Sequence, residues 1–444
     1  MALGAWAPAS VPLVLAALVG LLLLVLGYAR PDLYLPAALL GAAAILGSQE
    51  GLQPPELLYF AYLSTFLVAW YAWWFLTGTA RLRSSQDLFT AGTIVLGGLG
   101  GVTLGLLFGA PITGIRNDLV GFFPLLLYFP VREAVAGSPR GAHYVSMALL
   151  GLSLVTAALV LWELYSTVIS ATAAWEIIDV RVTGYEIPLL IGSVASLAAV
   201  AYSEQAYKRM VALGLSVLLL IFLFITKSRG YWIGWAFAVG LLFLFLPSTR
   251  RRTLLRWGAA GAFFGAVALF LIAGEVAIAF AIGIVNRFST LASAFTTDVS
   301  LLNRYVETDA LWNRISRNPI LGHGFGTEFS YNDLTLQGRR TWAYAHNGFA
   351  GLWFKLGVWG FCLIIGWWLH AAWEGFVASR SRALSPIERG YGLGASTALL
   401  GVLLTTYTSG IYFVDAQILL ITVTVALASG LRLRSQTLIG TREE

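Results

Sequence analysis

A histidine stands where a long apolar run of the sequence begins, in the order Ala345, His346, Asn347, Gly348. At the point where a helix enters a membrane, an imidazole is partly desolvated but still reachable from water. A neutral imidazole in that place can take a proton from an attacking hydroxyl group. His346 is therefore a candidate general base, and a histidine that only caps the helix is the alternative.

An arginine lies between two apolar runs that almost touch, within Lys227, Ser228, Arg229 and Gly230. Arg229 must then sit at or just below the membrane interface. A charge at the bilayer centre costs about 2.5–3.5 kcal/mol of insertion free energy on insertion scales. A charged residue at or near the membrane is therefore by default a candidate functional residue. A planar guanidinium pairs with two phosphate oxygens at once. The alternative is an arginine that snorkels to anchor a helix end.

Between these two motifs the sequence predicts an amphipathic helix that ends before Pro319. The residues at three- and four-residue steps are Leu301, Leu302, Tyr305, Thr308, Trp312 and Ile315. Arg304 and Arg314 fall on the polar side, where arginines would meet lipid headgroups or remain solvated. Arg304 is a second candidate for binding phosphate, and Arg314 a supporting one.

A glycine-rich run follows, with Gly322, Gly324 and Gly326 at alternate positions and His323 among them. Such glycines let the backbone turn tightly and approach a ligand closely. His323 competes with His346 for the role of base, although a turn residue is the simpler interpretation. The run follows no predicted strand, which argues against a dinucleotide-binding fold.

The elements that must position these residues are membrane spans. Of the 444 residues, 58% are hydrophobic and 11% are charged, whereas a soluble domain has roughly 25% charged residues. The sequence predicts an all-α polytopic bundle of 12 or 13 spans, with residues 1–444 as a single transmembrane domain. The expected spans are 11–29, 32–47, 57–78, 88–109, 118–130, 143–162, 186–202, 210–226, 230–246, 254–274, 347–370, 391–409 and 411–430.

Basic residues set the orientation, because cytoplasmic loops are enriched in lysine and arginine. One set of alternate loops carries most of them: Arg30, Arg81, Arg83, Arg132, Arg140, Lys208, Arg209, Arg250, Arg251, Arg252, Arg256, Arg380, Arg382, Arg389, Arg432, Arg434 and Arg442. The net charge of +6 thus indicates basic cytoplasmic loops and no nucleic-acid partner. The one long loop on the other side, about 275–346, is expected to be periplasmic and to contain the amphipathic helix.

The order of these motifs resembles the O-antigen ligase superfamily, which also holds O-antigen and exopolysaccharide polymerases. The resemblance rests on the Ser-Arg-Gly turn, the arginine-bearing helix, Asn-Pro-x-x-Gly-x-Gly-x-Gly and His-Asn-Gly, all within about 226–350. It implies a metal-independent, GT-C-like membrane glycosyltransferase whose donor is a glycan on undecaprenyl diphosphate. It further implies that Arg229 and Arg304 hold the diphosphate and that His346 activates the acceptor hydroxyl. We infer that Asn347 orients His346.

The resemblance predicts a ligase that joins the glycan to lipid A–core on the periplasmic side of a bacterial inner membrane, with inversion at the anomeric carbon. A polymerase, with a second lipid-linked glycan as acceptor, is the main alternative. A transporter is less favoured, because no span is rich in charge and the polar residues crowd one external loop. The expected partners are these glycan lipids and membrane lipids. No cofactor is expected, and no metal, since no Asp-x-Asp pair occurs.

Overall fold

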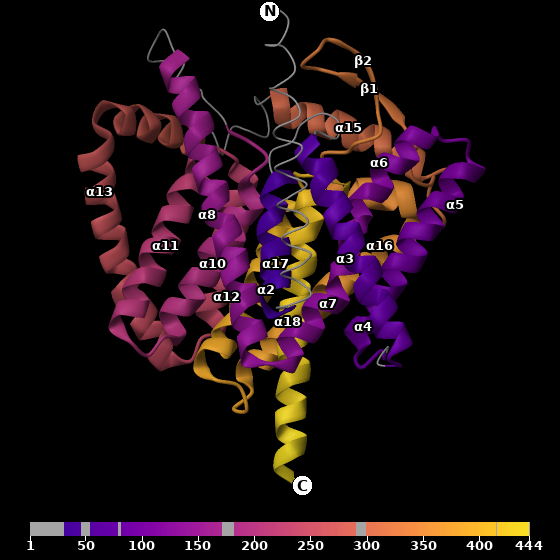
Figure 1. The fold of residues 1–444 in the computed structure, drawn as a ribbon. Helices are drawn as coiled ribbons and strands as arrows, with labels where there is room; N and C mark the ends of the chain where they lie inside the picture. The colour runs from indigo at the N-terminus through magenta and orange to yellow at the C-terminus, as the bar shows by residue number, and fades with distance from the viewer. Residues whose placement is uncertain are drawn as a thin grey trace, which may run out of the picture.

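The fold was analysed in a computed structural model, which describes residues 31–45, 54–78, 81–170, 182–289, 299–413 and 415–443. Helices run between two opposite ends of the molecule and carry nearly all of its mass (Figure 1). The expected span 11–29 lies outside the described residues.

Seven helical stretches among the described residues are long and apolar enough to cross a membrane: 56–76, 85–107, 112–137, 139–169, 206–225, 348–380 and 416–441. Two shorter apolar helices, α10 (Glu186–Tyr202) and α12 (Arg229–Phe245), run beside them. These helices confirm a multi-pass, all-α membrane protein.

The elements before α10 form the first half of the bundle. They are α2 (Pro31–Gly41), η1 (Ala42–Ile45), α3 (Pro54–Leu76), α4 (Ser85–Gly92), the π-helix η2 (Thr93–Leu99), α5 (Gly100–Leu107), α6 (Ile112–Phe122), η3 (Phe123–Leu127), α7 (Tyr128–Gly137) and α8 (Pro139–Ser170). The predicted span 118–130 is therefore not one straight helix. It consists of α6, a 3-10 turn and α7 in succession.

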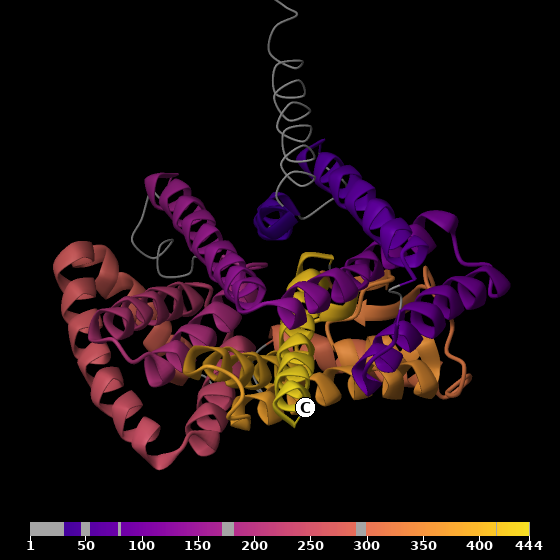
Figure 2. The ribbon, with the colours of Figure 1, turned by 60° about the horizontal axis from the view of Figure 1, so that its bottom comes forward.

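The second half contains α11 (Ala206–Ile225), α13 (Ser248–Ser289), α16 (Gly348–Arg380), α17 (Pro386–Thr405), η4 (Ile411–Phe413) and α18 (Asp415–Glu443). Figure 2 shows α18 near the middle of the bundle and α13 at its outer edge. The apolar stretch of α18 is 89% buried, which fits this central position.

Close packing between α12 and α17 depends on small residues. A Cβ on Gly401 of α17 would lie 2.6 Å from the carbonyl oxygen of Gly234 in α12.

A compact segment that lies outside the helical bundle, here called the external segment for that reason alone, connects α13 to α16 at one end of the bundle (Figure 1). It contains α15 (Val299–Ile315) and an antiparallel hairpin of β1 (Phe329–Asp333) and β2 (Gly338–Trp342). The connection from α16 to α17 lies at the opposite end (Figure 1). Helix α13 continues to Ser289, so helix occupies residues 275–289 where the sequence analysis placed the start of the loop.

The amphipathic helix forms where it was predicted, but its buried stripe was assigned wrongly. The buried residues of α15 are Asn303, Glu307, Leu311 and Ile315, at steps of four. Trp312, assigned to the apolar face, is 46% exposed. Polar residues can occupy this buried stripe of α15 because the hairpin and the start of α16 donate hydrogen bonds to them.

Candidate active site

A carboxylate on α15 holds the predicted base. Glu307 is 1% exposed, and one of its oxygens lies 2.7 Å from Nδ1 of His346. Its other oxygen accepts the backbone N–H of His346, also at 2.7 Å. A carboxylate on Nδ1 favours the tautomer with the proton there, which leaves Nε2 able to accept a proton. The pair therefore has the geometry of a general base and the group that orients it.

Aromatic side chains surround the imidazole. The rings of Trp342 and Tyr344 lie edge-on to His346, at centroid distances of 5.9 and 5.4 Å. The His346 side chain keeps 30% of its surface exposed, so the ring stays accessible between these walls. Burial raises the pKa of the Tyr344 hydroxyl, which consequently stays neutral beside the dyad.

A short turn between α17 and α18, residues 405–410, joins the dyad to the rest of the bundle. The Tyr344 hydroxyl accepts the N–H of Gly410 at 3.1 Å. The N–H of Gly348 donates to the carbonyl of Thr406 at 2.8 Å. The two residues that bond to the turn thus flank His346 in sequence, and the turn fixes the backbone that carries the base.

Of the two predicted phosphate-binding arginines, Arg304 contacts Thr408 of the same turn, and Arg229 precedes a glycine that packs against it. The guanidinium of Arg304 donates to the Thr408 carbonyl at 3.1 Å. Arg229 begins α12, and a Cβ on the adjacent Gly230 would lie 2.4 Å from the Thr408 hydroxyl. Both arginine side chains are half-buried. Residues that are far apart in the sequence are therefore gathered around one turn.

The segment leading to Arg229 is tightly held. Ser228 donates to the carboxylate of Glu186 at 2.6 Å, and Glu186 is 5% exposed at the start of α10. Lys227 has a φ of 52° and is 3% exposed. A lysine buried to this extent is not a snorkelling anchor. The turn presents Arg229 from a rigid backbone.

The glycine-rich run contacts protein backbone. His323 and Gly324 donate their N–H groups to the carbonyls of Phe354 and Lys355, each at 2.8 Å. Gly322, Gly324 and Gly326 have φ values of 76°, 83° and 74°, in the left-handed region that favours glycine. A Cβ on Gly324 would lie 2.0 Å from the backbone nitrogen of Gly105 in α5. The run therefore anchors the external segment to α5, α6 and α16.

The three supporting candidates have structural contacts. His323 places Nε2 2.9 Å from the carbonyl of Arg314 and its ring against Phe354. Arg314 donates to the carbonyl of Glu328 at 3.3 Å. Asn347 caps α16 by accepting the N–H of Ala350 at 3.2 Å. All three help to fix the segment around His346, while Glu307 forms the hydrogen bond to its imidazole.

A family model described as O-antigen ligase matches residues 214–365 of this chain. The match makes this segment similar to the O-antigen ligase superfamily. No curated protein matches the chain. The match to the O-antigen ligase family covers α12, α15, the hairpin and the first half of α16, and hence Arg229, Arg304, Glu307 and His346. It supports a membrane glycosyltransferase of the ligase or polymerase type.

Glu307 does not stand out in the sequence, because an acidic residue among arginines on an amphipathic helix usually faces water. Its signal was the four-residue step from Asn303, another polar residue that the fold buries. Asn303 accepts the N–H of Leu334 at 2.8 Å. The buried polar residues of α15 therefore form hydrogen bonds with both the hairpin and the candidate base.

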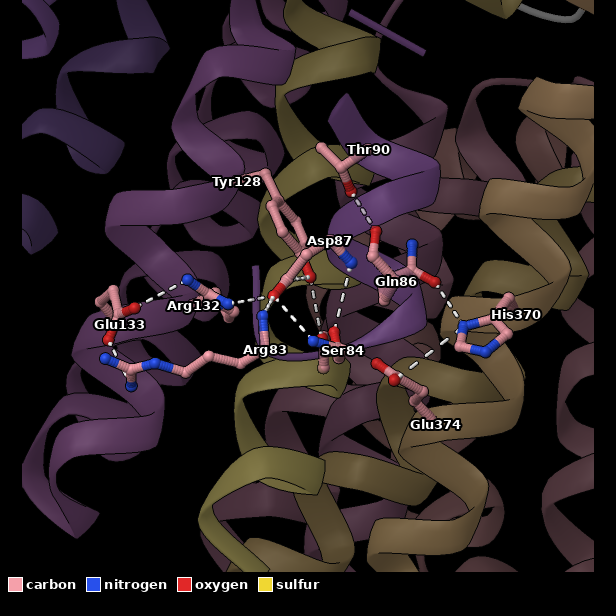
Figure 3. A network of polar contacts seen from close by, with 11 residues as sticks. Arg83, Ser84, Gln86, Asp87, Thr90, Tyr128, Arg132, Glu133, His370 and Glu374 are labelled. Carbon is pink, nitrogen blue, oxygen red and sulfur yellow. Dashed lines mark hydrogen bonds and ion pairs between the residues drawn. The ribbon is translucent and has the colours of Figure 1, made fainter. Parts of the chain in front are cut away.

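A second polar cluster lies at the opposite end, where α4, α7 and α16 meet (Figure 3). Arg132, expected in a cytoplasmic loop, is 0% exposed and forms an ion pair with Asp87 at 2.5 Å. Asp87 also accepts the Tyr128 hydroxyl at 2.8 Å. His370 lies 2.7 Å from the side-chain oxygen of Gln86. A buried charge needs such partners, and here they tie the start of α4 to its neighbours.

Proposed function

We propose that this protein transfers a glycan from undecaprenyl diphosphate to a hydroxyl of lipid A–core at the periplasmic face of a bacterial inner membrane. The observation that carries the proposal is the gathering of an oriented histidine and two arginines around residues 405–410. Glu307 and His346 supply a base. Arg304 and Arg229 supply positive charge beside the same turn.

The chemistry requires one bond to form and one to break at the anomeric carbon of the donor. The acceptor oxygen attacks that carbon, and the carbon–oxygen bond to the diphosphate breaks. The hydroxyl proton passes to Nε2 of His346, and both bonding electrons leave with the lipid diphosphate. A single displacement of this kind inverts the anomeric configuration.

The arginines would act on the leaving group. Negative charge grows on the diphosphate oxygen as the bond breaks, and preorganised cations stabilise that charge most effectively where water is excluded. Arg304 and Arg229 are half-buried, so their charges are screened less than those of exposed arginines. Their held positions also reduce the reorganisation needed during the reaction.

The proposed base is tested by His346→Ala in purified protein reconstituted with an undecaprenyl-diphosphate glycan and lipid A–core. General-base catalysis contributes about 10²–10⁴-fold, so turnover should fall by that factor. His323→Ala is the matched control and should keep most of the activity. A His346→Ala protein with near wild-type turnover would remove this residue from the mechanism.

The acceptor is tested in the same assay. Offering the lipid-linked glycan alone separates ligation from polymerisation, because a polymerase elongates it without lipid A–core. We expect product only when lipid A–core is present. Chain growth on the donor lipid itself would replace the ligase proposal with the polymerase alternative and leave the roles of the site residues unchanged.

The proposed orientation is tested with single cysteines in a Cys362→Ser background. Asn332 in β1 and Arg382 after α16 are both exposed and lie at opposite ends of the bundle. A membrane-impermeant thiol reagent on intact spheroplasts should label a cysteine at Asn332 and spare one at Arg382. Labelling of the second position alone would put the site in the cytoplasm, where the proposed donor and acceptor do not meet.

A further inference from the structure

A cavity of about 710 Å³ opens toward the α16–α17 end of the bundle, away from the candidate active site. Its walls come from the first half of α8, the second half of α10, and the starts of α11 and α17. They are mostly apolar, with Leu150, Leu154, Ile191, Val211 and Leu215 among the lining residues. The volume falls in the 300–1,000 Å³ range of small-molecule sites.

The cavity wall contains a hydroxyl group without a partner. Ser196 is 3% exposed, and its Oγ makes no hydrogen bond to any residue that the structure describes. A buried hydroxyl left unpaired costs free energy that an oxygen of a bound molecule would recover. The polar lining residues His143, Glu204 and Lys208 lie where α8, α10 and α11 reach the α16–α17 end of the bundle.

Three arginines lie behind the lining residues at this same edge, and none of them lines the cavity itself. The guanidinium of Arg250 lies 4.3 Å from the ring centre of Tyr202, which also lines the cavity. The charges of Arg250, Arg389 and Arg380 all act on the Tyr202 hydroxyl. They come from three elements, α13, α17 and the end of α16, so the fold brings them together.

Arg250 donates one hydrogen bond to the Ala201 carbonyl at 2.8 Å, and the charged groups that act on it are two arginines and one carboxylate among the described residues. Arg250 is repelled by Arg389 and Arg209, and Glu204 is the acidic residue that opposes them there. The Nε of Arg389 is buried and has no hydrogen-bond partner in the described part of the chain. A buried guanidinium donor without an acceptor, beside other arginines, indicates a site for an anion.

We propose that this cavity binds an anionic phospholipid of the cytoplasmic leaflet, with an acyl chain between α8, α10 and α11 and the phosphate on Arg250 and Arg389. Guanidinium groups bind phosphate oxygens bidentately. Basic pockets between helices on the cytoplasmic side are known to hold lipid phosphates. The apolar walls favour a lipid over free phosphate, because inorganic phosphate would leave the cavity unfilled.

The test titrates the purified full-length chain in detergent with phosphatidylglycerol and counts bound lipids by native mass spectrometry. Each arginine near a lipid phosphate contributes about 1 kcal/mol, or roughly fivefold in affinity. Arg389→Gln should therefore weaken phosphatidylglycerol binding about fivefold, and Arg250→Gln with Arg389→Gln about 25-fold. Arg81→Gln removes the same charge from an exposed loop at the same end and should change nothing.

Filling the cavity gives an independent test. Ala195→Phe places a ring among the apolar lining residues and keeps every arginine, so it should abolish binding of phosphatidylglycerol. The melting temperature without added lipid checks that each variant is folded. Equal binding of phosphatidylcholine, displacement by inorganic phosphate, or binding unchanged in the arginine double variant or in Ala195→Phe would each overturn the proposal.

Discussion

Glu307→Gln isolates the role of the carboxylate that holds the proposed base. The wild-type carboxylate accepts two donors from His346, its backbone N–H and Nδ1, each at 2.7 Å. A glutamine of the same shape has one oxygen to accept and one NH₂ group to donate. The backbone N–H must keep the oxygen, so the NH₂ group faces Nδ1. The ring proton then moves to Nε2, and the base is blocked.

The size of the effect follows from the bond that is lost. To react, the variant must place the proton back on Nδ1 without an anionic acceptor. A hydrogen bond to a charged group is worth about 1.5–3 kcal/mol, which corresponds to about 10- to 150-fold in rate. The loss should not exceed that of His346→Ala, whose ceiling is about 10⁴-fold.

The assay is the initial rate of glycan transfer by reconstituted protein at varied donor concentration. Glu307→Gln should lower kcat and leave the KM for the donor unchanged, because the arginines that hold the diphosphate are intact. Glu328→Gln, an exposed residue of the same segment, serves as the control. The double variant with His346→Ala should be no slower than His346→Ala alone. Additive losses, or full activity of Glu307→Gln, would refute the dyad.

Three further predictions concern the arginines, the metal requirement and the anchor of the external segment. Arg304→Lys and Arg229→Lys keep the charge but lose the planar fork, so turnover should fall at least tenfold, whereas the exposed Arg317→Lys should match wild type. Turnover should persist in excess chelator, and strict dependence on added magnesium or manganese would contradict the arginine mechanism. Lys355→Met leaves its buried partner Asp118 charged and without its cation, held only by the N–H of Gly326, which should cost about 3–5 kcal/mol of stability. Adding Asp118→Asn should restore part of the lost melting temperature, and a double variant less stable than Lys355→Met would contradict this account.

Hydropathy predicted the bundle well, because a helix that crosses a bilayer must be apolar over its whole length. The expected span 186–202 coincides with α10, and 230–246 differs from α12 by one residue. The break at 123–127 between α6 and α7 was not predicted. An apolar run looks the same to a hydropathy average whether its path is straight or broken.

The sequence singled out the charged residues of the candidate site, but it did not show the contacts between them. Arg229, Arg304 and His346 stand out because a membrane protein rarely keeps such groups at its interface. The turn at 405–410 carries no charged residue, and no local pattern shows that it meets α12, α15 and α16. Glu307 was missed because its partner is 39 residues away, and such pairing depends on the hairpin between them.

The glycine run has a consequence for building chimeras of this protein. Residues 318–327 dock backbone to backbone against α5, α6 and α16, so any replacement there must keep left-handed glycines at the same three positions. The tip of the hairpin, from Leu334 to Gly338, is exposed. Its donors to Asp333, chiefly the Thr335 hydroxyl, hold the pKa of that carboxyl well below its usual range, so the turn is closed locally. Sequences from other proteins should therefore be exchanged at the hairpin tip, while the glycine run is left in place as the fixed frame.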